Sequence, residues 1–271
     1  MRLTLVQSKP QLGDVAANLA AIRSVVEDVE FDFLVLPELF ATGYFFHELR
    51  QVQELSEPVP DGPTTRFLID QAAAHAGYIC AGLVERGDGG QLYNSALLVG
   101  PTGLIGCYRK LHLFFEEKLW FAPGEGPLQV YDLGIARVGM MICFDWRYPE
   151  TARILALRGA QILLHPANLV EPYCQDAMVT RCLENRVFAA TANRIGTDTK
   201  PNGASLTFTG RSQVVSPQGV ALCQASEDGP AVLSVDITPE EADDKQVTEY
   251  NHLLRDRRTE LYDPIIGKTT Q

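Results

Sequence analysis

The apolar run that ends at Cys143 constrains the fold of this chain more strongly than any other feature. Residues 135–143 are almost continuously apolar, which is typical of a strand buried on both faces of a sheet. A turn follows, and Pro149 and Glu150 then stand in the first turn of a helical pattern. The stretch predicts a strand, a sharp bend at Cys143 and a helix. Helical N–H groups near the bend would favour a thiolate and could bind an oxyanion, although a lone cysteine in an apolar segment is usually an inert small hydrophobe.

Short apolar runs alternate with amphipathic segments along the rest of the chain, as in layered α/β domains. Helices are predicted at 18–30, 64–76, 149–158 and 176–186, and strands at 3–7, 33–37, 78–84, 94–99, 104–108, 161–165, 187–193, 212–216 and 231–237. Loops are predicted at 41–63 and in the aromatic segment 109–124. No low-complexity segment divides the chain, so we expect a single domain over residues 1–271. The polar stretch from about 239 to 271 is expected to be a surface or dimer-interface tail.

Composition and charge argue against several classes of function. The net charge of −11 disfavours nucleic acid or anionic membrane as a partner. No apolar run reaches the ~18–20 residues of a membrane span, and the first residues are typical of a strand rather than a signal peptide. The six cysteines form no C-x-x-C pair, and the five histidines lack metal-ligand spacing. We therefore expect a reduced, cytoplasmic protein with no metal, no nucleic-acid partner and no membrane partner.

Four ionisable residues stand at strand ends or in the aromatic segment: Glu38, Lys110, Glu117 and Cys143. The carboxyl ends of strands in α/β sheets converge where ligands bind. A carboxylate desolvated after a buried strand could take the proton of a thiol, and a lysine could stabilise a developing oxyanion. Each residue also has a structural interpretation. Glu38 could cap a helix or pair with an arginine, Lys110 could end a solvated strand, and Glu117 could belong to an exposed acidic pair.

Blocks around these four residues, and further blocks downstream, resemble the nitrilase superfamily of carbon–nitrogen hydrolases. In chain order they are PELFATGY (37–44), YRKLHLF (108–114), EKLWFAPG (117–124), GMMICFD (139–145), LRGAQILLHPAN (157–168), RCLENR (181–186), TANR (191–194) and DRRTELY (256–262). The resemblance covers almost the entire chain.

The resemblance implies a four-layer αββα sandwich that forms homodimers or larger assemblies and uses no cofactor. It implies that Cys143 is the nucleophile, Glu38 the general base, Lys110 the oxyanion stabiliser and Glu117 a second, positioning glutamate. The backbone N–H of Phe144 would assist Lys110. The reaction implied is hydrolysis of a non-peptide carbon–nitrogen bond through a thioester.

The substrate is less constrained. Phe144 and Asp145 after the nucleophile resemble the amidase and carbamoylase branches, whereas nitrile-hydrolysing members typically carry Trp-Glu there. Arg147 could bind a substrate carboxylate or form a salt bridge, for example to Glu150. Further candidate substrate-binding residues are Tyr44, Phe114, Trp120, Phe144, Trp146 and Asn168. We expect omega-amidase-like hydrolysis of short, acid-bearing amides; small aliphatic nitriles, N-carbamoyl compounds or a catalytically silent scaffold are the alternatives.

Overall fold

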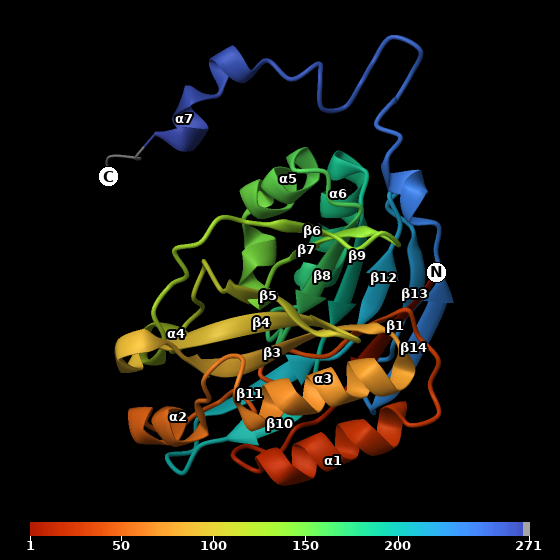
Figure 1. Ribbon diagram of the computed structural model, residues 1–271. Helices are drawn as coiled ribbons and strands as arrows, with labels where there is room; N and C mark the ends of the chain where they lie inside the picture. The colour runs from red at the N-terminus through yellow and green to blue at the C-terminus, as the bar shows by residue number, and fades with distance from the viewer. Residues whose placement is uncertain (268–271) are drawn as a thin grey trace.

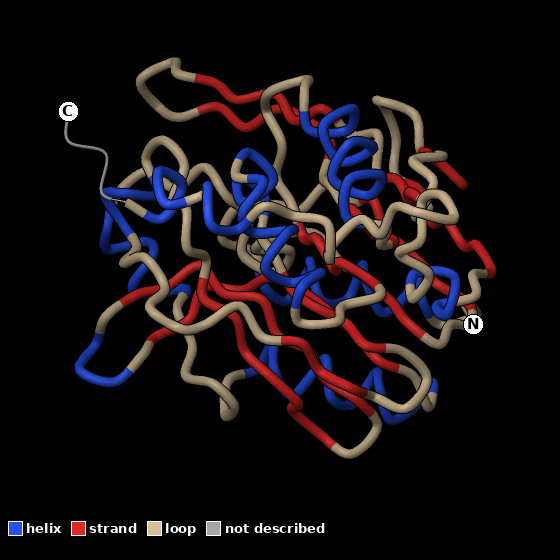
Figure 2. Tube along the Cα trace, turned by 90° about the horizontal axis from the view of Figure 1, so that it is seen from above, coloured by secondary structure: helices blue, strands red, loops and turns tan. Residues whose placement is uncertain are grey.

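The fold is a sandwich of two six-stranded sheets with helices on both outer faces, in a computed structural model that describes residues 1–267 (Figure 1). From bottom to top, Figure 1 shows α1 and α3, the first sheet, the second sheet, and then α5 and α6. Figure 2 looks down through these layers, with helices lying over the strands. The arrangement confirms the predicted αββα sandwich.

The first sheet has the strand order β14-β1-β2-β3-β4-β5, and its central strands β1, β2 and β3 are parallel. Its strands are β1 (Arg2–Gln7), β2 (Phe33–Val35), β3 (Tyr78–Arg86), β4 (Leu92–Gly100), β5 (Gly103–Arg109) and β14 (Ala231–Asp236). Helices α1 (Val15–Val26) and α3 (Pro63–His75) cover the outer face. Ile22 of α1 and Phe67 of α3 share a buried apolar cluster with Leu34 of β2, so the amphipathic helices bury their apolar sides on this sheet.

The second sheet has the order β13-β12-β9-β8-β7-β6, with β7, β8 and β9 parallel. Its strands are β6 (Val130–Asp132), β7 (Arg137–Met140), β8 (Ile162–Pro166), β9 (Phe188–Ala192), β12 (Gln213–Val215) and β13 (Ala221–Gln224). Helices α5 (Pro149–Leu157) and α6 (Cys174–Asn185) cover its outer face. Leu5 of β1, Val138 of β7 and Leu163 of β8 belong to one buried cluster, so the main core lies between the two sheets.

Several short elements lie where no regular structure was predicted. Helix α2 (Leu49–Leu55) interrupts the expected loop 41–63, and α4 (Glu117–Trp120) lies within the aromatic segment. Strands β10 (Ile195–Thr199) and β11 (Ser205–Thr209) form a separate hairpin. The outermost strands β6 and β13 of the second sheet were also not predicted. These strands are short and largely exposed, so they carry little of the apolar periodicity that identifies a strand.

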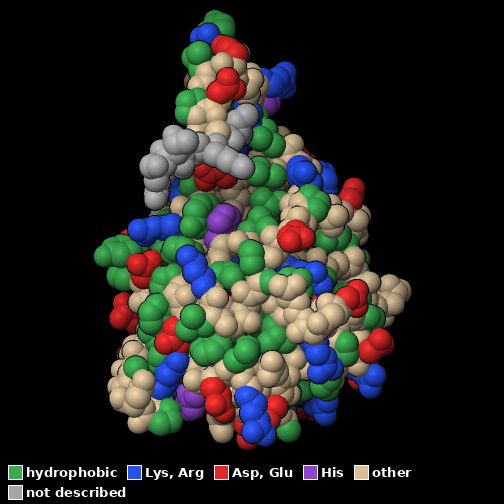
Figure 3. Space-filling view, turned by 90° about the vertical axis from the view of Figure 1, so that its left-hand side faces the viewer, with side chains coloured by type: hydrophobic (Ala, Val, Ile, Leu, Met, Phe, Trp, Pro, Cys, Tyr) green, Lys and Arg blue, Asp and Glu red, His purple; other side chains and the backbone are tan. Residues whose placement is uncertain are grey.

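The tail leaves the body after a short contact. Lys245 Nζ donates hydrogen bonds to the carbonyl oxygens of Asn185 and Arg186, at 2.9 and 2.6 Å. Beyond this point the backbone of the described tail runs above α5, apart from the two sheets, as Figure 1 shows, and projects from the body in Figure 3; Tyr250 there is exposed. It includes the short helix α7 (Asp263–Ile266). Among residues 1–267 no helix is both long and apolar enough to span a bilayer.

Candidate active site

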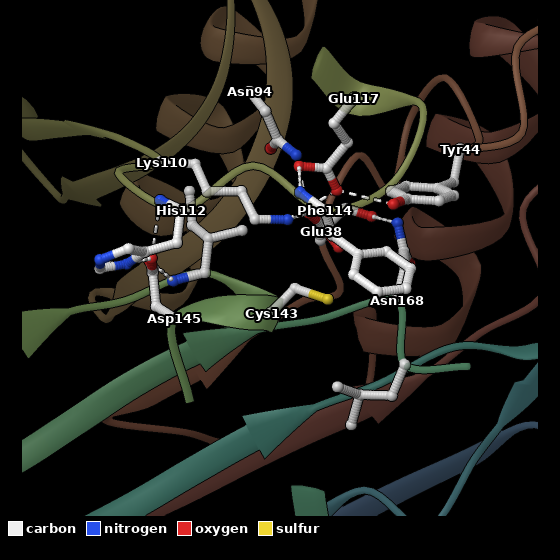
Figure 4. A network of polar contacts seen from close by, with 12 residues as sticks. Glu38, Tyr44, Asn94, Lys110, His112, Phe114, Glu117, Cys143, Asp145 and Asn168 are labelled. Atoms are coloured by element: carbon white, nitrogen blue, oxygen red, sulfur yellow. Dashed lines mark hydrogen bonds and ion pairs between the residues drawn. The ribbon is translucent and has the colours of Figure 1, made fainter. Parts of the chain in front are cut away.

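The four ionisable side chains singled out in the sequence lie together between the two sheets (Figure 4). Glu38 follows β2 and Lys110 follows β5, both in the first sheet; Cys143 follows β7 in the second sheet, and Glu117 opens α4. All four residues are buried. Strands β2 and β5 of the first sheet and β7 of the second therefore end at the same place, and the residues after them place polar side chains there.

Lys110 lies between two carboxylates. Its Nζ donates to Glu38 Oε1 at 2.7 Å and to Glu117 Oε1 at 2.6 Å, and its side chain is fully buried. Burial alone would lower the pKa of Lys110, but Coulombic attraction to Glu117 and Glu38 outweighs it and raises that pKa. The lysine is therefore a fixed positive charge at neutral pH.

The two carboxylate oxygens of Glu38 have different surroundings. Oε1 accepts hydrogen bonds from Lys110 Nζ and from Asn94 Nδ2, the latter at 2.7 Å. Oε2 is buried and has no hydrogen-bond partner within residues 1–267. The backbone carbonyl of Glu38 accepts from Asn168 Nδ2 at 2.8 Å. One oxygen is thus held in place while the other remains able to accept a proton.

Glu117 is held by three donors. Lys110 Nζ and the Tyr44 hydroxyl, at 2.6 Å each, donate to Oε1, and the Phe114 N–H donates to Oε2 at 3.2 Å. Burial and the nearby charge of Glu38 raise the pKa of Glu117 to about 7, although Lys110 opposes the shift. Glu117 can therefore take up a proton near neutral pH.

Cys143 opens a 3₁₀ turn, Cys143–Arg147, with its backbone in the left-handed region at φ 41°. A non-glycine residue in this region is strained, and such strain is common at functional sites. Burial, followed by the negative charge of Glu38, raises the pKa of the thiol well above its usual value, although Lys110 and a backbone N–H of Asn168 lower it. Burial therefore opposes the stabilisation of a thiolate that helical N–H groups at the bend would provide. The thiol needs a base to ionise.

A buried carboxylate, Asp145, ties the Cys143 bend to the segment around Lys110. Its Oδ2 accepts from the Ile142 N–H and the Tyr108 hydroxyl, each at 2.8 Å. Its Oδ1 contacts His112 Nδ1 at 2.7 Å. Sequence analysis used Asp145 only to compare branches of the superfamily, and it missed the supporting role of Tyr108, His112 and Asn94. Adjacency was the only available signal, because Tyr108 and His112 flank Lys110 and Asp145 follows Cys143.

A small, open cavity lies beside Cys143. Four of the predicted substrate-binding residues line it, together with three residues that follow Asn168: Phe114, Phe144, Trp146, Asn168, Leu169, Val170 and Glu171. The rings of Phe114 and Phe144 are 4.9 Å apart. Tyr44 instead contacts Glu117. Trp120 packs in the apolar cluster of α2 and α4, where Lys200 Nζ lies 5.9 Å from its ring.

Arg147 lies at the edge of this cavity. Its side chain is half exposed, its guanidinium carbon lies 5.2 Å from the Trp146 ring centroid, and its Nη1 is 3.9 Å from Glu171 Oε2. The possible salt bridge to Glu150 is replaced by this longer contact with Glu171. Arg147 and Glu171 therefore bring opposite charges to the cavity edge.

Within residues 1–267 no group of three or more His, Cys, Asp or Glu side chains is placed to hold a metal ion. The arrangement is instead a thiol, a carboxylate with a free oxygen and a fixed ammonium group around a small cavity. Such a set can perform nucleophilic attack with base assistance and stabilise an oxyanion.

Comparison with known proteins gives consistent results. The family model for carbon-nitrogen hydrolases matches residues 2–245. A protein named nitrilase from Pyrococcus abyssi is 43% identical over 97% of this chain and 99% of its own length. An omega-amidase from Homo sapiens is 32% identical, with 84% of this chain and 83% of the relative covered.

Solved structures agree with the sequence relatives. An amidase from Nesterenkonia sp. AN1, whose active-site cysteine carries the acetamide moiety of fluoroacetamide, matches with a TM-score of 0.80 and 27% identity, covering 97% of this chain and 96% of the other. Cysteine chemistry is thus present in a structural neighbour. The family match extends over most of the chain and the two relatives match 97% and 84% of it, so this protein belongs to the carbon–nitrogen hydrolase family.

Proposed function

We propose that the protein hydrolyses a short aliphatic amide or omega-amide to a carboxylic acid and ammonia, with Cys143 as nucleophile. The observation that carries the proposal is that the two carboxylate oxygens of Glu38 have different hydrogen-bond partners. Its Oε1 is held by Lys110 and Asn94, while its buried Oε2 has no partner within residues 1–267. A general base needs such a free oxygen beside a thiol that does not ionise by itself.

The proposed reaction has two halves. Glu38 Oε2 takes the thiol proton as Cys143 Sγ attacks the amide carbon, and the carbonyl oxygen becomes an oxyanion stabilised by Lys110 and the Phe144 N–H. The C–N bond breaks, Glu38 returns the proton to the departing nitrogen, and ammonia leaves behind a thioester. Water then loses a proton to Glu38, attacks the thioester and releases the acid, and the proton returns to Cys143. In this scheme Glu117 positions Lys110.

The cavity supports a short substrate, because it is small and its walls include the aromatic side chains of Phe114, Phe144 and Trp146. Phe114 and Trp146 would contact its carbon chain, and the buried Oδ1 of Asn168, which has no partner within residues 1–267, could accept from its N–H groups. Arg147 would bind a terminal carboxylate after leaving Glu171. Tyr44 and Trp120 support this site through Glu117 and α4.

The experiment that tests this proposal measures ammonia release from a panel of short aliphatic amides, omega-amides of dicarboxylic acids, N-carbamoyl compounds and the corresponding nitriles. The proposal predicts preference for acid-bearing amides and complete loss in Cys143→Ala. Arg147→Ala should raise KM for acid-bearing amides but leave neutral amides unchanged, whereas Glu171→Gln should lower KM for the acid-bearing ones. Equal effects of Arg147→Ala on both amide classes would contradict its role in carboxylate binding.

Nitrile hydrolysis is the second candidate, because the relative named nitrilase is 43% identical along almost the entire chain. Nitrile turnover above amide turnover would replace the amide assignment and retain the nucleophile. Activity on N-carbamoyl compounds alone would favour a carbamoyl amidohydrolase. Absence of any Cys143-dependent ammonia would favour a silent scaffold member.

We also propose that residues 1–271 act as one domain that forms a homodimer or larger assembly in the cytoplasm, with no nucleic-acid or membrane partner. Support comes from apolar side chains exposed on α5, α6 and the tail: Leu157, Leu183, Tyr250 and Leu261. Light scattering after size-exclusion chromatography should give at least twice the chain mass of 29.9 kDa. A chain truncated after residue 246 should give a smaller assembly, and an unchanged mass would exclude the tail from the interface.

A further inference from the structure

A buried histidine outside the proposed catalytic set contacts the backbone of the nucleophile. His165 is the fourth residue of β8, and its side chain is completely buried. Its Nε2 lies 3.0 Å from the backbone carbonyl oxygen of Cys143. Its Nδ1 lies 3.0 Å from Thr191 Oγ1 on the neighbouring strand β9. The two ring nitrogens thus connect the core of the second sheet to the Cys143 bend.

The chemistry of the donors and acceptors fixes which group donates in each of these two hydrogen bonds. Burial lowers the pKa of His165 to about 4, so the ring is neutral at pH 7. A carbonyl oxygen can only accept, and Nε2 must therefore carry the single ring proton. Nδ1 is then an acceptor, and the Thr191 hydroxyl donates to it. The order is Thr191 O–H to His165 Nδ1, and His165 Nε2–H to the Cys143 carbonyl.

Peptide geometry carries the effect across the bend. The carbonyl oxygen of Cys143 and the N–H of Phe144 belong to the same planar trans peptide unit and point in opposite directions. With the oxygen fixed on His165, the Phe144 N–H is directed away from the sheet core. Cys143 and Phe144 both line the cavity. A strained residue at φ 41° keeps its conformation only when its surroundings hold it, and His165 supplies such a contact.

We propose that His165 is a positioning residue that aims the Phe144 N–H at the substrate oxyanion by holding the Cys143 carbonyl, while the Thr191 hydroxyl donates to Nδ1 and holds the ring in its orientation. The inference rests on the proposed function, since it concerns the oxyanion of the same reaction. His165 itself touches neither substrate nor the reacting sulfur.

The test separates acylation, which needs an aimed N–H, from alkylation of the thiol by iodoacetamide, which forms no oxyanion. His165→Phe keeps a buried ring but removes the donor. It should lower kcat/KM for the best amide by about 100-fold, the typical loss for one oxyanion donor. Its rate of alkylation at Cys143 should stay within about twofold, because thiol ionisation depends on Glu38 and Lys110.

Two further variants make the test specific. His165→Gln keeps an N–H donor near the Nε2 position and should recover at least about tenfold of the lost turnover. Thr191→Val removes the donor to Nδ1 that holds the ring in its orientation and should lower acylation selectively, even if His165→Phe fails to fold. The control is His75→Gln, because His75 stacks on Phe31 and is not part of the proposed site. This variant should change neither rate.

Parallel loss of alkylation and acylation in His165→Phe or Thr191→Val would overturn the inference, because it would indicate general collapse of the bend. Unchanged turnover in both variants would overturn it as well. These outcomes differ from failure of the proposed function, in which the unmodified protein itself releases no Cys143-dependent ammonia.

Discussion

Replacing Lys110 with methionine tests whether the buried charge cluster is held together by its single cation. Methionine keeps most of the apolar stem of the lysine and removes the ammonium group. Lys110 Nζ contacts Glu38 Oε1 at 2.7 Å and Glu117 Oε1 at 2.6 Å, with these side chains at most 3% exposed. Removing one partner of a buried ion pair typically costs about 3–5 kcal/mol. Because this cation serves two carboxylates, we expect Lys110→Met to lose at least about 3 kcal/mol at pH 8.

The loss should depend on pH with a definite sign. The pKa of Glu117 is already raised to about 7 by burial, and loss of Lys110 would raise it further. A carboxyl group whose pKa is higher in the folded state stabilises the fold at low pH, and that contribution disappears as pH rises through the folded pKa. The variant should therefore be destabilised less at pH 6 than at pH 8, by about 1–3 kcal/mol.

Urea unfolding followed by tryptophan fluorescence at fixed protein concentration measures both quantities. Lys118→Met is the matched control, since Lys118 is exposed, and it should change the free energy of unfolding by less than about 0.5 kcal/mol. Adding Glu117→Gln to Lys110→Met should restore part of the stability at pH 8, because one unpaired charge is removed. A loss below about 1 kcal/mol, or an equal loss at both pH values, would refute the reasoning.

Three further predictions follow from individual contacts. In Gly82→Ala the new Cβ would lie 2.6 Å from the Cα of Glu38, so the backbone of Glu38, the proposed general base, must shift. Ammonia release should fall at least about tenfold, while the circular dichroism spectrum stays native. Tyr44→Phe removes a donor at 2.6 Å from Glu117, which should raise the pKa of Glu117 further; unfolding measured from pH 6 to 9 should show its stabilising contribution persisting to higher pH. His165, with its pKa lowered to about 4, contributes stability above pH ~6.5 that is lost as pH falls toward 4. The free energy of unfolding of His165→Gln, measured in urea relative to the unmodified protein, should therefore become more favourable by about 2 kcal/mol between pH 7 and pH 5. Constant differences across these pH ranges would contradict the last two.

The layered fold was predictable because buried strands and amphipathic helices have distinct periodicities. The apolar run before Cys143 and the start of α5 at Pro149 were both predicted. The β10–β11 hairpin was not, since most of its residues are threonine, serine, glycine and aspartate. Only Leu206 and Phe208 of β11 alternate with polar residues, and a pattern of two apolar residues is too short to identify a strand.

The residues of the candidate site were easier to predict than their support. The four ionisable residues follow strands or open a helical turn: Glu38, Lys110, Glu117 and Cys143. Their place in the predicted elements and the motifs that resemble the family therefore pointed to the same residues. Asn94, by contrast, lies inside β4 and reaches Glu38 only through the register of that sheet. His165 looked like an ordinary strand residue for the same reason. Contacts of this kind depend on which side chains two packed sheets bring together, and no local pattern encodes them.

The most direct test of the account is the mass of the protein during turnover. The best amide of the panel is mixed with enzyme, the reaction is quenched in acid within milliseconds to seconds, and the intact and peptide masses are measured. The account predicts an added acyl group on the peptide that contains Cys143, which forms with the release of ammonia and is absent in Cys143→Ala. Ammonia release that continues in Cys143→Ala, or turnover without any adduct on Cys143, would contradict it.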